Sequence, residues 1–207
     1  AYDELLANQL ALALIRRALR KLPGSKISGK GQLRGRVIEN LPFQLTTAQE
    51  SAITEITNDM ATNGRMLRLL QGDVGSGKTV VALFAALNAI ETGGQVAIMA
   101  PTEILARQHF ETLSQLLKDT GITLGILTGR DRGAGRKKTM NALEDGTLNL
   151  IVGTHALFQK DVIFSNLLLV VIDEQHRFGV HQRLTLAEKG RGVDTLVMTA
   201  TPIPRTL

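Results

Sequence analysis

Eight consecutive residues have the types and spacing that hold a phosphate chain, and they read Gly72-Asp73-Val74-Gly75-Ser76-Gly77-Lys78-Thr79. In the pattern G-x-x-x-x-G-K-T, the glycines let backbone N–H groups converge on phosphate oxygens. Lys78 supplies a full charge for the β- and γ-phosphates, and the hydroxyl of Thr79 can ligate Mg²⁺. A flexible turn before a helix is the alternative, but all the fixed positions are present and both flanks fit. The pattern therefore predicts a site for a nucleoside triphosphate.

Two adjacent carboxylates follow a second apolar run. Residues 167–172 are all apolar, and Asp173-Glu174-Gln175-His176 come directly after them. A strand that ends in two acids places them at the carboxyl edge of a sheet, where parallel folds bind ligands. Asp173 can hold Mg²⁺ through water, and Glu174 can deprotonate an attacking water. Such a pair is often only a helix start. In a chain that also carries a phosphate loop, however, it predicts hydrolysis of the bound nucleotide. His176 lacks a second ligand at zinc spacing, so we expect an interaction residue.

The elements that must position these groups alternate along the chain. Apolar runs of strand length alternate with segments of helical length, which is typical of a parallel sheet with crossover helices. We therefore expect an α/β fold, a parallel sheet with helices on both faces. The predicted strands are 67–71, 95–100, 123–127, 149–153, 167–172 and 194–199, and the predicted helices are 47–61, 79–91, 103–118, 134–144 and 180–189.

The first forty residues differ from the rest. Residues 3–20 have the period of an amphipathic helix, which Pro23-Gly24 would end. Residues 24–36 are rich in glycine and basic residues and show neither a helical nor a strand period, so we expect a linker. The expected organisation is a helical, basic linker over 1–40 and one nucleotide-binding domain over 41–207.

Composition sets further limits. The chain has 207 residues, 43% of them apolar, so it can bury a sizeable core. Cysteine is absent and no apolar run reaches the roughly 18 residues of a membrane span, which suits a cytoplasmic protein. The net charge is +5, and residues 1–39 carry that excess, with eight Lys or Arg against three Asp or Glu. A basic segment fits contact with a phosphate backbone and equally a solvated surface. A start at Ala1 and an end just after a motif lead us to expect a fragment.

Four motifs occur here in a known order. The phosphate loop, the stretch APTEILA at 100–106, the DExH box at 173–176 and the stretch MTATP at 198–202 resemble motifs I, Ia, II and III of superfamily 2 helicases. The longer stretches LQGDVGSGKTVVA, MAPTEILARQH, DEQHRFGV and TATPIPRTL are similar to the RecG family, bacterial ATP-dependent translocases that remodel branched DNA. This resemblance covers 41–207 closely and implies a RecA-like fold for that domain. The stretch DELLANQLALALIRR is similar to the helix that follows that family's wedge domain.

The resemblance implies roles for individual residues. Gln49 matches the glutamine that reads the adenine edge, and Phe43 is expected either to stack on the base or to lie in the core. Motif III, with Thr199 and Thr201, implies coupling between the nucleotide and the DNA groove, and we expect His176 to take part. Lys78, Asp173 and Glu174 are the expected catalytic residues. The residues that match backbone-gripping loops are Pro101, Thr102, Glu103, Arg107, Gly129, Arg130, Gly153, Thr154 and His155.

Two further features bear on DNA. Backbone contacts position a protein without reading sequence, and with no Trp, one Tyr and six Phe the chain has little aromatic material for base stacking. The basic cluster of Arg132, Arg136, Lys137 and Lys138 could face phosphate, but we expect a solvated helix face.

The resemblance implies a monomeric ATP-dependent DNA helicase, an ATP hydrolase that uses Mg²⁺ to regress forks and migrate Holliday junctions in recombination and repair. The family's second motor domain, with its arginine finger, and its wedge domain have no counterpart in this sequence. We therefore expect the chain alone to be nearly inactive. The alternatives are the transcription–repair coupling translocase, which Ser76, Glu103 and Gln175 disfavour, a nucleotide-gated DNA-binding module without turnover, and a small-molecule kinase, which would need a lid and an acceptor site.

Overall fold

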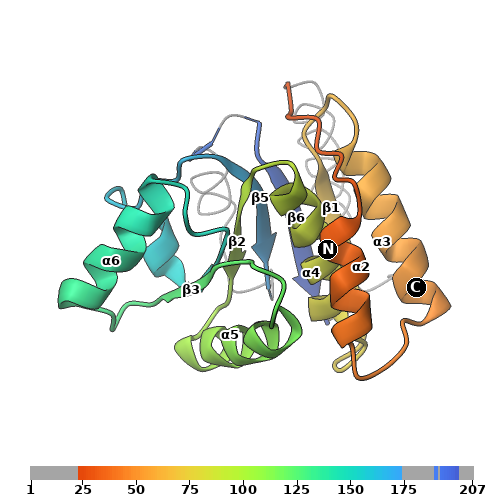
Figure 1. The fold of residues 1–207 in the computed structure, drawn as a ribbon, viewed down its shortest axis with the longest axis horizontal. Helices are drawn as coiled ribbons and strands as arrows, with labels where there is room; N and C mark the ends of the chain where they lie inside the picture. Colours follow the sequence, from red (N-terminus) through yellow and green to blue (C-terminus); the bar gives the residue numbers. More distant parts are fainter. Residues whose placement is uncertain (1–22, 174–188, 191, 201–207) are drawn as a thin grey trace, which may run out of the picture.

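A computed structural model describes residues 23–173, 189–190 and 192–200. In this part of the chain six strands form one sheet in the order β1-β6-β5-β2-β4-β3, and every neighbouring pair is parallel (Figure 1). The expected parallel α/β fold is confirmed, with strand ends within one residue of the prediction. The strands are β1 (Leu67–Gln71), β2 (Gln95–Met99), β3 (Leu124–Leu127), β4 (Leu150–Gly153), β5 (Leu167–Ile172) and β6 (Asp194–Thr199).

Four of the five helices expected between residues 47 and 189 are present, namely α3 (Thr47–Met60), α4 (Lys78–Glu91), α5 (Glu103–Leu116) and α6 (Gly133–Glu144). The predicted helix over 180–189 falls almost wholly outside the described residues, and so does the one over 3–20. None of the described helices has the length and apolar character needed to cross a membrane.

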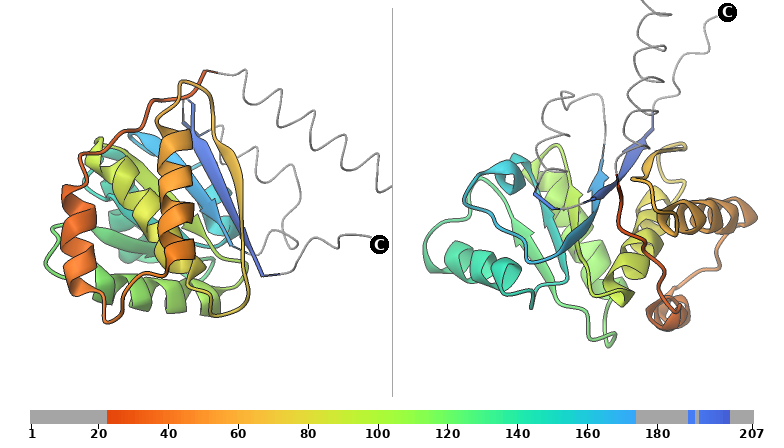
Figure 2. Two further views of the ribbon diagram at one scale, coloured as in Figure 1. Left: turned by 90° about the vertical axis from the view of Figure 1, so that its right-hand side faces the viewer. Right: turned by 90° about the horizontal axis from the view of Figure 1, so that it is seen from above.

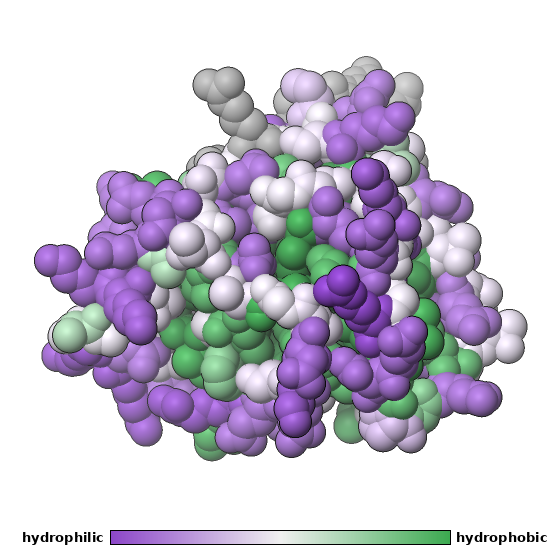
Figure 3. Space-filling view, in the orientation of Figure 1, coloured by the Kyte–Doolittle hydropathy of each residue, from purple (hydrophilic) through white to green (hydrophobic). Residues whose placement is uncertain are grey.

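The central strands β2, β4 and β5 send side chains into two cores, one on each face of the sheet. On one face, Val96 and Ile98 of β2 pack in a cluster that includes the buried side chains of α3, α4 and α5. On the other face, Ala97 and Met99 pack with α6 and the short 3₁₀ helix η1 (His155–Phe158). Burial of both faces explains why β5 is continuously apolar. In Figure 3, hydrophilic residues cover most of the outer surface, and hydrophobic residues show mainly between the helices.

The prediction of a linker without regular structure over residues 24–36 holds for residues 24–31, but it is wrong for residues 32–36, which are helical. Residues Gln32–Asn40 form helix α2, which packs on α4 (Figure 2). The side chains of Ile27 and Val37 are fully buried in the core. Residues 24–40 therefore pack as part of the α/β domain. The organisation of the chain outside the described residues stays a prediction.

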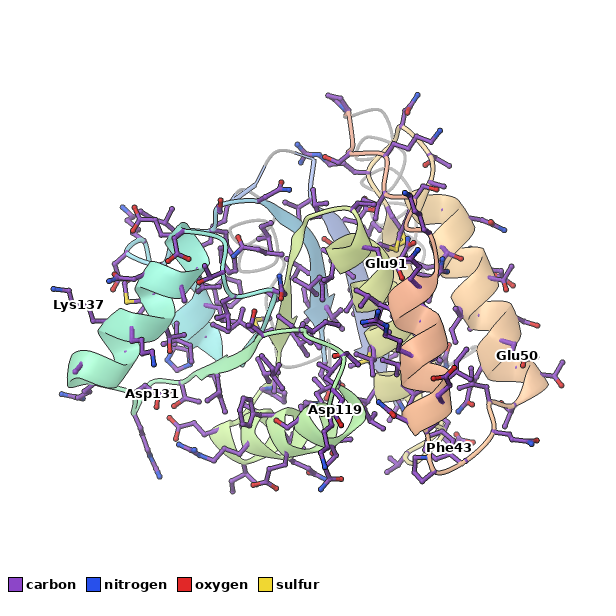
Figure 4. The ribbon with its side chains drawn as sticks, in the orientation of Figure 1. Phe43, Glu50, Glu91, Asp119, Asp131 and Lys137 are labelled. Atoms are coloured by element: carbon purple, nitrogen blue, oxygen red, sulfur yellow. The ribbon has the colours of Figure 1, made fainter. Side chains whose placement is uncertain are left out.

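Two side chains of α4 hold this segment. The carboxylate of Glu91 accepts hydrogen bonds of 2.6 Å from the N–H groups of Gly31 and Leu33, and Asn88 accepts one of 2.9 Å from Gly29. A helix start leaves its first N–H groups without partners, and a carboxylate there satisfies them and favours the helix dipole. Figure 4 shows Glu91 at the end of α4 beside the first turn of α2. No local pattern predicted α2, because Glu91 lies 60 residues beyond Gly31.

A buried acid joins the amino ends of β1 and β6. Asp194 has no exposed surface, and its Oδ1 accepts a 2.7 Å hydrogen bond from the N–H of Met66. Its Oδ2 is buried without a hydrogen-bond partner in the described part of the chain. Burial raises the pKa of Asp194 to about 7, against the lowering effect of the bond from Met66.

Candidate nucleotide site and the adjoining sheet edge

The carboxyl edge of the sheet, to which the arrowheads of β5 and β6 point in Figure 1, gathers most of the predicted site residues. The phosphate loop follows β1, Thr199 ends β6 and Asp173 follows β5, and these three strands are neighbours. We call this part the nucleotide half. The loops after β2, β4 and β3 carry the predicted backbone-gripping residues, and we call this part the motif Ia half. The fold thus separates the two predicted functions along one edge.

The phosphate loop has the backbone that its glycines permit. Gly75 and Gly77 both have a φ of 80°, in the left-handed region that favours glycine. Lys78 is the first residue of α4, and its Nζ donates to the carbonyl oxygens of Gly72 at 2.8 Å and Asp73 at 2.7 Å. The ammonium group therefore lies over the loop, next to the N–H groups of a helix start, which is where a phosphate binds.

A cavity of about 550 Å³ opens beside this loop. Its size suits a small-molecule ligand. It brings together residues that were predicted separately to bind the base, the phosphates and the metal of a nucleotide. Among its lining residues are Phe43, Gln49, Lys78, Thr79 and Asp173.

Gln49 links the start of α3 to the phosphate loop. Its Oε1 accepts from the N–H of Thr46 at 3.0 Å, and its Nε2 donates to the carbonyl of Ser76 at 2.9 Å. The side-chain amide of Gln49 has a second N–H and a second lone pair on its oxygen. It can therefore still donate one hydrogen bond to the edge of a base and accept one from it. Its reading of adenine stays a prediction.

Phe43 is 47% exposed at the rim of the cavity, in the loop between α2 and α3 (Figure 4). Of the two expectations for this residue, a place in the core is therefore wrong.

The side chains of the cavity that could hold a magnesium ion are oxygen donors. Thr79 offers a hydroxyl and Asp173 a carboxylate, and Mg²⁺ prefers such hard ligands together with waters and substrate phosphates. No group of three His, Cys, Asp or Glu side chains able to hold a metal occurs in the described residues. This donor set fits a magnesium ion carried in with a nucleotide.

His109 was not predicted from the sequence to belong to the site. Its Nε2 lies 2.8 Å from Oδ2 of Asp173, and the two side chains are 12% and 15% exposed. His109 lies on the buried stripe of α5, which also carries Ala106 and Leu113. A histidine at helical spacing among buried residues was the available signal. Its partner lies 64 residues away, so no motif joins the two.

The loops of the motif Ia half lie against one another. Oε2 of Glu103, after β2, is 3.0 Å from Nε of Arg130, after β3, in an ion pair that is not aligned as a hydrogen bond. A Cβ added to Gly129 would lie 3.6 Å from Glu103 and 3.8 Å from His155, which follows β4. The Arg130 side chain is 85% exposed, and such surface pairs contribute about 0–1 kcal/mol, so a phosphate could replace Glu103 as its partner.

Other residues of this half differ in their access to solvent. Arg107 and His155 are exposed, and Oγ1 of Thr102 accepts from the N–H of Leu105 and caps α5. Thr154 is 3% exposed, which argues against a direct DNA contact by its side chain. Gly153 is needed for close packing, because a Cβ there would lie 2.3 Å from the carbonyl oxygen of Leu127.

The basic cluster on α6 is only partly free. Arg136 is 18% exposed and pairs with Asp161 at 3.1 Å, whereas Arg132, Lys137 and Lys138 are exposed. Lys137 points away from the molecule in Figure 4. These positions agree with a solvated helix face.

Thr199 contacts the phosphate loop through its backbone, since its carbonyl accepts from the N–H of Gly72 at 3.3 Å. Glu174, His176 and Thr201 lie outside the described residues, so their predicted roles stay predictions.

Three kinds of comparison with known proteins give consistent results. A family model described as DEAD/DEAH box helicase matches residues 46–207. The chain is 50%, 49% and 48% identical to the ATP-dependent DNA helicases RecG of Aquifex aeolicus, Haemophilus influenzae and Escherichia coli strain K12. These matches cover 99–100% of this chain but only 26–30% of the relatives, so the chain spans less than a third of their length.

A solved structure of RecG bound to a three-way DNA junction matches 99% of this chain and 27% of that chain, with a TM-score of 0.86 and 48% identity. The DUF1998 helicase MrfA, solved with DNA and AMPPNP, has a TM-score of 0.65 at 19% identity and shares the fold. The RecA-like fold is therefore confirmed.

Proposed function

Because the chain belongs to the DEAD/DEAH box helicase family, we propose that it is the ATP-binding motor domain of a DNA helicase that remodels branched DNA. The observation that carries this proposal is the cavity that brings Lys78, Thr79 and Asp173 together with Gln49. A cation at a helix start, a hydroxyl and a carboxylate are the groups that bind a triphosphate with its metal.

The proposed reaction, hydrolysis of ATP, depends on how the site positions the reacting groups. Phosphoryl transfer needs little covalent help and depends on alignment and electrostatic stabilisation. Lys78 would bind the β- and γ-phosphate oxygens, while Thr79 and Asp173 would hold Mg²⁺, which neutralises negative charge on those oxygens. Glu174 would orient and deprotonate the attacking water. Gln49 and Phe43 would bind the base.

The motif Ia half is the proposed DNA site. Arg107, Arg130 and His155 are exposed there, and Glu103 already holds Arg130 in a weak pair that a phosphate could replace. The same loops offer Pro101, Thr102 and Gly129 as close-approach positions, whereas Gly153, which was also predicted to contact the backbone, is buried. Such loops contact sugar and phosphate rather than base edges, so binding would be sequence-independent and salt-sensitive. The similar RecG structure, which is bound to a three-way DNA junction, supports branched DNA as the substrate.

The activity of the whole protein is part of the proposal, because the chain spans only 26–30% of its RecG relatives. We infer that the remaining length supplies a second motor domain with an arginine finger and a wedge domain that recognises the branch. The whole protein would be a monomeric ATP hydrolase of the bacterial cytoplasm that regresses forks and migrates Holliday junctions in recombination and repair. His176, Thr199 and Thr201 would couple the nucleotide state to DNA movement.

ATP hydrolysis by the full-length protein tests this proposal. We expect branched DNA to raise the rate more than linear duplex, and Glu174→Gln to lower it at least about a hundredfold with ATP binding kept. The chain alone should show little DNA-stimulated hydrolysis, because an arginine finger contributes about 10³–10⁵ in rate. A rate of ATP hydrolysis that does not change when DNA is added, or that is not lowered by Glu174→Gln, would contradict the proposal. Transfer of phosphate to an added small acceptor would indicate a kinase instead.

A further inference from the structure

One side-chain contact joins the two halves of the sheet edge. His109 belongs to α5, whose first residue, Glu103, follows β2, whereas Asp173 follows β5. Strands β2 and β5 are neighbours, and the N–H of Asp173 donates to the carbonyl of Met99 at 2.8 Å. The Nε2 of His109 lies 2.8 Å from Oδ2 of Asp173, close to the hydrogen-bond optimum.

We propose that His109 is a positioning residue for the metal-facing carboxylate of Asp173. This inference rests on the proposed function, because it assumes that Mg²⁺ accompanies the nucleotide. A carboxylate oxygen can only accept, so the imidazole must carry its proton on Nε2. That bond fixes Oδ2, and the other oxygen of Asp173 is the one that would hold Mg²⁺. Hydrogen bonds from such outer partners orient metal-binding carboxylates and tune metal affinity.

The position of Asp173 makes such a holder necessary. The backbone of Asp173 is fixed by Met99, but its side chain lies at the wall of the nucleotide cavity and is 15% exposed. An unheld carboxylate there would populate several rotamers, and ordering it on metal binding would cost free energy. His109 is itself held on the stripe of α5 between the fully buried Ala106 and Leu113. The helix therefore fixes the imidazole, and the imidazole fixes the carboxylate.

A purely structural role is the competing interpretation, since a buried hydrogen bond also stabilises a fold. The two roles differ in their dependence on metal. A structural bond would change nucleotide affinity equally with and without Mg²⁺, whereas a positioning bond would change only the benefit that Mg²⁺ brings.

The experiment titrates this chain with a fluorescent ATP analogue, once with Mg²⁺ and once with a chelator, and takes the ratio of the two affinities as the metal benefit. His109→Phe keeps a ring but removes the donor, and we expect the metal benefit to fall about tenfold with the metal-free affinity unchanged. His109→Gln places an N–H near the position of Nε2 and should retain the benefit. Gln108→Ala, an exposed neighbour on α5, is the matched control and should match the unaltered chain.

A double variant adds a second criterion. In the background of Asp173→Asn, the substitution His109→Phe should cause no further loss of metal benefit, because the two residues act through one bond. Should His109→Phe fail to fold, the pair His109→Asn and His109→Gln makes the same comparison, since the shorter amide does not reach Asp173.

The outcomes separate the inference from the function on which it rests. An unaltered chain whose affinity ignores Mg²⁺ would refute the magnesium site itself. A normal metal benefit in the chain with His109→Phe, or an equal loss with and without Mg²⁺, would refute the role of His109 and leave the proposed function standing.

Discussion

Removal of the Glu91 carboxylate should release α2 from the domain. Glu91 accepts two hydrogen bonds of 2.6 Å from the N–H groups of Gly31 and Leu33, and both are partly buried. Hydrogen bonds to a charged group contribute about 1.5–3 kcal/mol each, and partial exposure reduces that contribution. We therefore expect Glu91→Ala to lower the free energy of unfolding by about 2–4 kcal/mol. Glu91→Gln keeps one acceptor and should cost about half as much.

Urea unfolding followed by circular dichroism measures this change, and limited proteolysis locates it. The chain with Glu91→Ala should be cleaved faster within residues 24–40, while its affinity for Mg-ATP should change little, because Glu91 ends α4 and the phosphate loop precedes its start. Glu111→Ala, at an exposed glutamate of α5, is the control. A loss in Glu91→Ala no larger than in this control would refute the idea that Glu91 holds α2.

Two other substitutions test the site and the core. Lys78→Ala removes a cation whose charge-assisted bonds contribute about 1.5–3 kcal/mol each, so titration calorimetry should show at least a tenfold loss of ATP affinity, and unchanged binding would disprove the assignment of the loop. Asp194 has a folded-state pKa of about 7 against an ordinary 3.8, so it stays protonated in the fold after it has ionised in the unfolded chain. Stability present below about pH 4 should therefore fall by on the order of 4 kcal/mol as the pH rises to about 7. Urea unfolding between pH 4 and 8 should show that Asp194→Asn removes most of this fall in the free energy of unfolding. Parallel pH profiles for the unaltered and the substituted chain would show that Asp194 is not a buried protonated acid.

Local patterns in the sequence predicted the features that depend on neighbouring residues. The phosphate loop is contiguous, and its glycines and Lys78 have the expected geometry. Strand β5 was predictable because burial on both faces makes it continuously apolar. The order of the strands could not be predicted in this way, and it is the order that divides the edge into two halves.

Features that depend on distant partners were missed. Helix α2 starts with the help of Glu91, and Asp173 is held by His109, 64 residues earlier in the chain. Neither partner stands out locally, because a glutamate at a helix end and a histidine among apolar residues are both common. The burial of Thr154 likewise follows from packing beneath its loop and not from its motif.

Helix α4 has a mechanical consequence. It begins at Lys78 in the phosphate loop and ends at Glu91, which holds α2, and its residues 80–89 are all buried to at least nine-tenths. Fourteen residues of helix span about 21 Å, and a helix packed on all sides cannot bend without disturbing the core. A displacement of the segment that Glu91 holds would therefore have to move α4 as a whole and could not be taken up by bending within the helix. The segment before α2 and the phosphate loop thus contact opposite ends of one rigid helix.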